Sequence, residues 1–529
     1  MNLQMQWPRA IVKAGMIAAL MAAAVLCVAV RPHRSTHAAA KPNIVVVMVD
    51  DMDTRGMELL VSSGRMPNFT RRILNLGTAY YFSNSFVTRS QCCPSRATFF
   101  TGQYAHNHGV LTNSRPFGTI ERFADRSTLP TWLKAAGYRT SLVGKYLVGY
   151  GTIVPMEYVP PGWDDWEALL DFTATRPYSY GMNDNGKIVT YGQFPWDYQA
   201  DVLASRAQGF IAKTESPFFL YLATSNPHLV VYPKYNECST TGSPWELVKD
   251  TDYTWGHTTY PAPRHMGWIF GDVTRYPLPQ PPSFNEADVS DKPVWYQNLP
   301  SMTPTDTSCL QKNYWRRMES MLSVDDMIGK VGQALDDKGA TSNTIWIFTS
   351  DNGFMLGEHR TLHKTHAFEE SLRVPLYIAH PVPGGGLKTI TQLALNNDLA
   401  PTIALMAGAP PAIEIDGRPL TWLMQNPSLA SWRKRFLLEH WHETTEGFNW
   451  LPEFAGIRTG GPSPIKYVEY PTVTSGINKE LYDLTADPYE LQSLYNSPSW
   501  QAAIADLHTR VLQLKTCRGS SCVAAENAP

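Results

Sequence analysis

The residues best suited to chemistry stand close together, where Cys92 and Cys93 precede Pro94 and Arg96. A proline fixes its own φ and disfavours the helical region for the residue before it. We therefore expect both cysteines to be extended, just before a turn, with a helix beginning near Arg96. A sulfur beside a helix N-terminus and a cation has a lowered thiol pKa, which activates it as a nucleophile. Local chemistry alone nevertheless favours the structural alternatives, a disulfide or a buried free thiol.

Acidic and amide side chains follow two other segments, residues 43–49 and 344–350. Both segments are typical of central parallel strands covered on both faces. Four oxygen-bearing side chains come directly after them: Asp50, Asp51, Asp351 and Asn352. Adjacent carboxylates are costly unless a cation or solvent relieves them, although a single Asp in such a place also caps helices. We expect all four at one edge of a sheet, where their oxygens suit Ca²⁺ or Mg²⁺ better than Zn²⁺.

Two residues that can carry positive charge also follow predicted buried strands. Residues 128–149 have the pattern of a helix, a turn and a strand, with Gly137 stopping the helix and Lys145 ending the strand. Residues 218–224 predict the next strand, which leads to His228. The alternatives to a functional role are a surface lysine and a structural histidine. The ends of parallel strands share one edge, so we expect both residues near the acids.

The segment Cys92 to Arg96, which reads Cys-Cys-Pro-Ser-Arg, is followed by Thr101-Gly102. It resembles the Cys-x-Pro-Ser-Arg…Thr-Gly signature of the type I sulfatases. In that family a formylglycine-generating enzyme oxidises the first cysteine to Cα-formylglycine, the catalytic aldehyde. The resemblance implies this conversion at Cys92, with Cys93 in the variable position. It also implies a Ca²⁺ site, with Mg²⁺ as an alternative ion, formed by five residues: Asp50, Asp51, Cys92 as formylglycine, Asp351 and Asn352.

The same resemblance implies a role for each cationic residue. Arg96 would hold the formylglycine, and Lys145 would contact both the formylglycine and the sulfate. His228 would bind sulfate and protonate the leaving oxygen, and Lys364 would bind sulfate. One hydroxyl of the hydrated aldehyde would attack sulfur while His228 or Lys364 protonates the alcohol. The second hydroxyl would then lose its proton and expel sulfate.

One position departs from the family pattern. Leu147 stands where many sulfatases have a histidine, often assigned as the base that expels sulfate. Three histidines near the predicted sulfate-binding lysine are candidates for that base or for substrate contact: His359, His363 and His366. His106 and His108 are assigned to structure or to the substrate rim, because harder oxygen ligands are available for a metal.

The resemblance implies an α/β fold like that of alkaline phosphatase, with a mostly parallel central sheet between helices. We expect a signal peptide at 1–40, a catalytic domain at 41–428 and a C-terminal α+β subdomain at 429–529. Residues 229–312 predict an irregular insertion, flanked by helices over 197–214 and 313–337. The C-terminal subdomain is expected to hold four short strands and a closing helix: 436–440, 456–459, 465–469, 480–484 and 499–515.

The start of the chain predicts export. Arg9 and Lys13 precede an apolar run, residues 14–30, and small residues at 37–40 provide a cleavage site. An uncleaved membrane anchor is the alternative, although the run is short for a span. Disulfides are stable outside the cell. The cysteine spacing predicts the pair Cys517–Cys522 and, less strongly, the pair Cys238–Cys309.

Composition narrows the function further. The chain has 529 residues, 43% of them hydrophobic, and a net charge of −2. This describes a globular protein, argues against nucleic-acid binding and gives no reason to expect a stable membrane partner. Residues 91–115 and 144–166 resemble the N-acetylglucosamine-6-sulfatases and heparan endosulfatases, which implies a sulfated glycan substrate. The alternatives are an aryl- or alkylsulfatase, a phosphodiesterase or phosphonate hydrolase on the same fold, and a non-catalytic binder of sulfated glycans.

Overall fold

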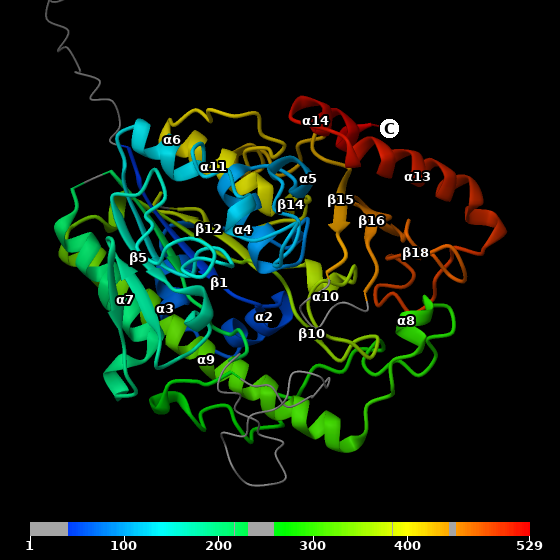
Figure 1. Ribbon diagram of the computed structural model, residues 1–529, viewed down its shortest axis with the longest axis horizontal. Coiled ribbons are helices and arrows are strands. Elements are labelled where there is room, and N and C mark those ends of the chain that lie inside the picture. The colour runs from blue at the N-terminus through cyan, green and yellow to red at the C-terminus, as the bar shows by residue number, and fades with distance from the viewer. Residues whose placement is uncertain (1–40, 216, 231–258, 383, 444–450, 529) are drawn as a thin grey trace, which may run out of the picture. The chain divides into compact units, whose positions relative to one another are not determined.

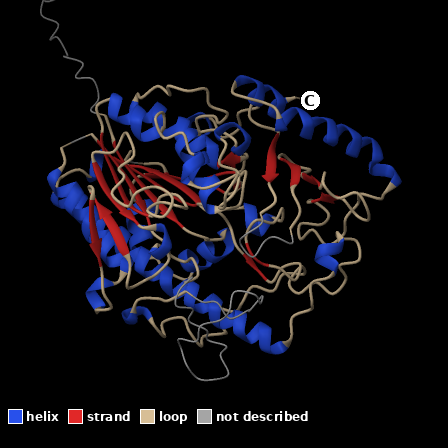
Figure 2. Ribbon diagram, in the orientation of Figure 1, coloured by secondary structure: helices blue, strands red, loops and turns tan. Residues whose placement is uncertain are grey.

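A ten-stranded sheet runs through the molecule between two layers of helices (Figures 1 and 2). The computed structural model describes residues 41–215, 217–230, 259–382, 384–443 and 451–528, and residues 41–529 cluster as one compact unit. The strand order is β13-β2-β12-β9-β1-β8-β4-β5-β6-β7. The five strands from β9 to β5 run parallel, while β12, β2, β6 and β7 bring antiparallel pairings at the two sides. The predicted fold class is confirmed.

The elements lie as follows. The strands of this sheet are β1 (Asn43–Val49), β2 (Thr78–Phe82), β4 (Arg139–Gly144), β5 (Asp165–Leu169), β6 (Gly181–Asp184), β7 (Lys187–Thr190), β8 (Phe218–Ala223), β9 (Thr344–Ser350), β12 (Leu376–His380) and β13 (Gly386–Ile390). Short pairs are formed by β3 (Ser85–Phe86), β10 (Met355–Leu356), β11 (Leu362–His363) and β14 (Ala394–Leu395). The helices before residue 430 are α2 (Thr54–Ser62), α3 (Pro67–Phe69), α4 (Cys92–Thr101), α5 (Ala105–His108), α6 (Leu129–Ala135), α7 (Gln199–Lys213), α8 (Val294–Gln297), α9 (Pro304–Asp337), α10 (Glu369–Leu372), α11 (Leu399–Ala407) and α12 (Thr421–Gln425).

The central strand β1 shows why these apolar segments form the middle of the sheet. Every residue of β1 is buried, and its side chains alternate between the two faces. Val45 and Val47 join a core with α7 and α9, whereas Ile44 and Val46 join a core with α4, α6 and α11. Both faces are therefore covered, which is the arrangement that the continuous apolar pattern predicts.

The long helix α9 begins earlier than predicted. We expected it from residue 313, but it starts at Pro304 inside the predicted irregular insertion. The hydroxyl of Thr303 accepts a hydrogen bond from the Asp306 amide, and the Asp306 carboxylate accepts one from the Thr303 amide. This capping box, with proline at the first helical position, fixes the start. The described remainder of the insertion, residues 259–303, is mostly irregular and carries the short helix α8.

A second, antiparallel sheet forms near the C-terminus. It contains β15 (Arg435–His440), β16 (Phe454–Thr459), β17 (Ile465–Glu469) and β18 (Lys479–Asp483), and α13 (Gln501–Lys515) packs against it. These elements match the prediction, whereas α14 (Ser520–Asn527) was not predicted. The predicted disulfide Cys517–Cys522 is present and joins the segment after α13 to α14. The boundary at residue 428 stays a prediction.

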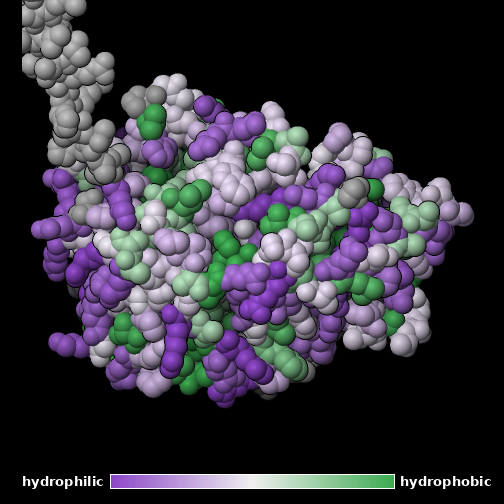
Figure 3. All heavy atoms as spheres, turned by 90° about the horizontal axis from the view of Figure 1, so that it is seen from above, coloured by the Kyte–Doolittle hydropathy of each residue, from purple (hydrophilic) through white to green (hydrophobic). Residues whose placement is uncertain are grey.

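Two predictions fall outside the described residues. They are the export signal at 1–40 and the second disulfide, whose Cys238 is not described. Among the helices that the structure describes, none combines the length and the apolarity needed to cross a bilayer. Seen from above, hydrophilic and hydrophobic residues are interspersed over the surface (Figure 3).

Candidate active site

The predicted acids meet where β1 and β9 end. These parallel neighbours are in register, with Val49 opposite Ser350, so the residues that follow leave the sheet together. The Asn352 amide donates to a carboxylate oxygen of Asp51 at 2.6 Å, and the Asp51 backbone N–H donates to Asp351 at 3.3 Å. All four predicted oxygen donors are buried. The sequence prediction that they share one edge of the sheet is confirmed.

Cys92 enters this cluster from the first turn of α4. The helix begins at Cys92 itself, so the prediction of two extended cysteines is wrong. Pro94 is the third helical residue, where a missing N–H costs nothing because the first-turn N–H groups have no acceptor inside the helix. The Cys93 N–H is satisfied by the Asn113 side chain at 2.9 Å. This tertiary contact stabilises a helical conformation that proline disfavours in the residue before it.

The thiol itself is not activated. Burial raises the pKa of Cys92 to about 12, and the nearby lysines only partly oppose it. The prediction of a lowered thiol pKa is therefore wrong, because the helix end and the cation lie in the protein interior rather than at its surface. Cys92 and Cys93 are both free, so they form no disulfide with each other. An unmodified Cys92 would be a protonated thiol at neutral pH.

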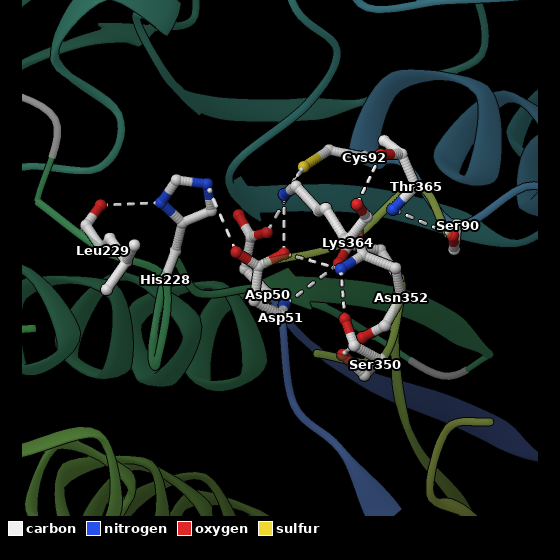
Figure 4. A network of polar contacts seen from close by, with 12 residues as sticks. Asp50, Asp51, Ser90, Cys92, His228, Leu229, Ser350, Asn352, Lys364 and Thr365 are labelled. Atoms are coloured by element: carbon white, nitrogen blue, oxygen red, sulfur yellow. Dashed lines mark hydrogen bonds and ion pairs between the residues drawn. The ribbon is translucent and has the colours of Figure 1, made fainter. Parts of the chain in front are cut away.

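The predicted cations lie beside the acids and Cys92, and Figure 4 shows one of them, Lys364, pointing toward Asp51 and the Cys92 sulfur. Lys364 donates to the Cys92 sulfur at 2.7 Å and to Asp51 at 2.6 Å. Lys145 pairs with Asp50, and Arg96 donates to Asp351 at 2.7 Å. These are buried, charge-assisted contacts, which are the strong kind. The structure thus brings together the residue types needed to bind a tetrahedral anion beside a nucleophile.

Close backbone packing sets the position of Lys145. The preceding Gly144 has φ +117°, and a Cβ there would lie 1.9 Å from the carbonyl oxygen of Ala223. That same carbonyl accepts the Lys145 N–H at 2.8 Å. Only glycine allows this approach of β4 to β8. The glycine therefore places the lysine at the carboxyl edge of the sheet.

The loop that carries Lys364 has an unusual backbone. Four of its residues other than glycine adopt positive φ: His359, Arg360, His363 and Thr365. Such conformations persist only where the surroundings enforce them, and they cluster at functional sites. The Thr365 N–H donates to the Ser90 side chain at 3.1 Å, which ties this loop to the turn before Cys92 (Figure 4).

The charges of the cluster are strongly coupled. Burial alone would raise the pKa of Asp50 and Asp51, but neighbouring groups, chiefly Lys145 for Asp50 and Lys364 for Asp51, lower both below the usual range. For Asp351 burial prevails and raises the pKa to about 6, with the charge of Asp50 adding to the effect. The first two carboxylates are therefore ionised at neutral pH and available as ligands.

His228 approaches from the loop after β8. Its Nδ1 lies 2.7 Å from the carbonyl oxygen of Leu229, which can only accept, so Nδ1 carries a hydrogen. Its Nε2 faces the Asp51 carboxylate at 3.5 Å (Figure 4). Burial lowers the pKa of His228 despite the nearby acids. The nitrogen that points into the cluster is thus the one able to exchange a proton.

The donor set fits a hard cation. Ligand atoms of Asp50, Asp51, Cys92 and His228 all lie within 4.8 Å of one another. Among the described residues, no donor reaches the buried side-chain oxygen of Asn352, while its nitrogen bonds to Asp51. A buried oxygen without a partner is costly, and a cation would satisfy it. Carboxylate and amide oxygens match Ca²⁺ or Mg²⁺.

Two of the three candidate histidines, His359 and His366, have structural surroundings. His359 bonds to Glu286 at 2.6 Å and stacks on Phe368, and His366 lies 3.2 Å from the Tyr296 hydroxyl. Leu147 is buried in the apolar core beside α4, so its side chain contributes to packing and does not act as a base. Two histidines of α5 bond to other elements, in agreement with a structural role: His106 to Glu439 and His108 to Thr98.

Sequence reasoning missed one buried residue of this region. Arg317, on α9, donates to the backbone carbonyls of Asp51 and Pro227. The sequence does carry a signal for Arg317, which is a charged residue among the apolar positions of a helix face that is otherwise buried.

The fold is of the alkaline-phosphatase-like α/β type, and its site gathers buried cations beside acids and a thiol, an arrangement that suits a tetrahedral anion. Residues 42–409 match the sulfatase family model, and residues 357–517 match the model of the N-sulphoglucosamine sulphohydrolase C-terminal region. The chain belongs to the sulfatase family and is a sulfuric ester hydrolase.

Individual relatives agree with this assignment. The chain is 32% identical to an arylsulfatase of Volvox carteri, over 91% of this chain and 76% of that one. It is 27% identical to the N-acetylglucosamine-6-sulfatase of Homo sapiens, over 91% and 86%. In fold it resembles BT4656, solved in complex with its substrate D-glucosamine-2-N,6-O-disulfate, with a TM-score of 0.69, 22% identity and coverage of 92% and 99%.

Proposed function

We propose that the protein removes sulfate from a glycan bearing 6-O-sulfated glucosamine units, with formylglycine at position 92 as the nucleophile. The observation that carries the proposal is the Cys92 sulfur, which contacts Lys364 at 2.7 Å and lies 3.6 Å from Asp50. At position 92, a side chain that can be modified lies beside cations and acids at the carboxyl edge of the sheet. The named relatives that act on N-acetylglucosamine-6-sulfate support the choice of sugar.

Each residue has a distinct task in this proposal. The aldehyde hydrate at position 92 attacks sulfur, and its formation requires the maturation enzyme to oxidise the thiol. Lys145 and Lys364 neutralise the sulfate oxygens, and Arg96 anchors the acids on which the geometry depends. The protonated form of His228, with hydrogens on both ring nitrogens, gives its Nε2 proton to the departing sugar oxygen and is left neutral with the hydrogen on Nδ1. Electrostatic stabilisation by preorganised donors provides the largest part of such catalysis.

A divalent cation completes the proposed site. When bound, Ca²⁺ or Mg²⁺ would polarise the sulfate and orient the nucleophile. Asp50, Asp51, Asp351 and Asn352 would hold it, together with the oxygen that replaces the sulfur of Cys92. Removal of the cation with a chelator should abolish most activity, and adding Ca²⁺ should restore it.

Asn352→Ala should weaken the affinity for Ca²⁺, measured by titration calorimetry, and unchanged affinity would contradict the assigned ligand.

The substrate is tested with matched esters. Purified, matured enzyme should release sulfate from N-acetylglucosamine-6-sulfate with a higher kcat/KM than from an aryl sulfate of similar size. The rival phosphodiesterase and phosphonate hydrolase activities use the same type of site, so the corresponding 6-phosphate and a phosphonate monoester are tested as well. Both should be poorer substrates than the sulfate. Faster hydrolysis of the phosphonate would contradict the proposal. Preference for the aryl ester would retain the sulfatase but reject the glycan.

The role of His228 predicts a dependence on the leaving group. His228→Gln keeps the side chain polar but removes the proton donor, so the rate on an alkyl or sugar sulfate should fall about 10²–10⁴-fold. The rate on an aryl sulfate with an acidic phenol should fall far less, because that leaving group departs without protonation. The measurement is kcat/KM for a series of leaving groups. Equal losses across the series would assign His228 to sulfate binding alone.

Export is also proposed, from the signal-like start of the chain. A glycan polymer is met outside the cytoplasm, so location and substrate are consistent with each other. Mass spectrometry of the mature N-terminus from the native host would test cleavage near residue 40.

A further inference from the structure

Arg317 occupies an unusual place for a charged residue. It lies on α9, is fully buried, and stands among apolar residues of that helix such as Tyr314, Met318 and Met321. Within the described residues no carboxylate lies within 4.0 Å of its guanidinium. A buried cation without a paired anion is costly, so its contacts must offset that cost.

Its contacts join three segments of the active site. One terminal nitrogen donates to the carbonyl of Asp51, and the other donates to the carbonyl of Pro227 at 3.0 Å. The ring of Phe354 lies 3.8 Å from the guanidinium carbon, and Phe354 follows Asn352 by two residues. Arg317 therefore touches the segments after β1, β8 and β9 at once.

We propose that Arg317 is the positioning residue that aligns the metal-ligand loop with His228. Asp51 and His228 belong to different strands, and their side chains face each other at 3.5 Å. Asp51 has φ +67°, a conformation that a residue other than glycine keeps only when its surroundings enforce it. The bond to the Asp51 carbonyl fixes that turn, and the bond to Pro227 fixes the residue before His228. This inference rests on the proposed roles of Asp51 and His228.

The guanidinium is suited to this task because its donors form a rigid, planar fork. A lysine at the same place offers a single nitrogen and would satisfy one carbonyl well and the other poorly. Methionine fills similar volume but leaves both carbonyls without a donor. A displacement of about 1 Å at a catalytic group can cost about 10²-fold in rate.

Three variants test the proposal: Arg317→Lys, Arg317→Met and, as the control, Arg316→Met. Arg316 is the neighbouring arginine; it pairs with Glu319 at 2.9 Å and lies over the Phe270 ring at 4.2 Å, and neither of these residues belongs to the cluster. We expect Arg317→Met to lower kcat about 10²-fold with a small change in KM, Arg317→Lys to retain intermediate activity, and the control to match the unmodified sequence.

A second measurement is independent of turnover. Titration calorimetry should show weaker Ca²⁺ binding by Arg317→Met than by Arg316→Met, since Asp51 is a proposed ligand, while circular dichroism shows both folded. If Arg317→Met does not fold, the comparison is made with Arg317→Lys. Unchanged kcat and Ca²⁺ affinity in a folded Arg317 variant would overturn the proposal. Retained turnover by Cys92→Ala, or faster hydrolysis of the phosphonate monoester than of the sulfate, would instead reject the proposed function.

Discussion

Cys92→Ala should reduce sulfate ester hydrolysis by roughly 10⁴-fold or more, because removing a covalent nucleophile abolishes the reaction path that depends on it. The side chain is small and already buried, so alanine leaves only a minor cavity and the fold should persist. The activity is measured as sulfate released from N-acetylglucosamine-6-sulfate. The melting temperature and circular dichroism spectrum report the fold. Appreciable residual turnover by the alanine variant would reject Cys92 as the nucleophile.

Cys93→Ala is the matched control. Cys93 is equally buried and free, but its contact to Asn113 runs through the backbone N–H and survives the substitution. It should retain activity. Mass spectrometry of the tryptic peptide of residues 90–96 from the native host should show the mass loss of thiol-to-aldehyde conversion at Cys92 in this control. A thiol at position 92 in active enzyme would contradict the proposed modification.

The acids of the site were predictable because two simple patterns coincide. Strands β1 and β9 are apolar along their whole length, which identifies them as central, and parallel central strands end at one edge. Asp50 and Asp351 could therefore be placed together although they are 301 positions apart in the sequence. The family resemblance supplied the identity of Cys92 and Lys364, since no periodicity distinguishes a catalytic lysine from a surface one.

The remaining features depend on tertiary contacts that local rules do not contain. Cys93 is helical against the preference of the residue before a proline, since Asn113 satisfies its N–H. Arg317 could not be assigned from residue types, because its acceptors are backbone carbonyls at positions 51 and 227, which any residue provides. The start of α9, in contrast, could be predicted from the sequence, because Thr303 and Asp306 form a capping signal. The surrounding prolines and polar residues led instead to the prediction of an irregular segment.

Lys364→Met should lower kcat/KM about 10²–10³-fold, the loss typical of removing one charged donor from a preorganised anion site. Lys364 is the cation that touches both halves of the cluster, the Cys92 sulfur and the Asp51 carboxylate. Methionine preserves most of the volume but leaves Asp51 with fewer positive neighbours, and it removes a charge that would face the sulfate. The loss should appear for aryl and sugar sulfates alike, because every sulfate ester presents the same anionic oxygens.

Lys466→Met provides the comparison that separates catalysis from folding. Lys466 is as buried as Lys364 and pairs with two carboxylates, Glu369 at 3.0 Å and Glu490 at 2.8 Å, but it lies on β17 of the second sheet. Breaking a buried ion pair costs about 3–5 kcal/mol in either place. Both variants should therefore lower the melting temperature, whereas only Lys364→Met should lower kcat/KM of the folded enzyme. Equal activity losses in the two variants would mean that Lys364 acts through stability, and the sulfate-binding role would then be wrong.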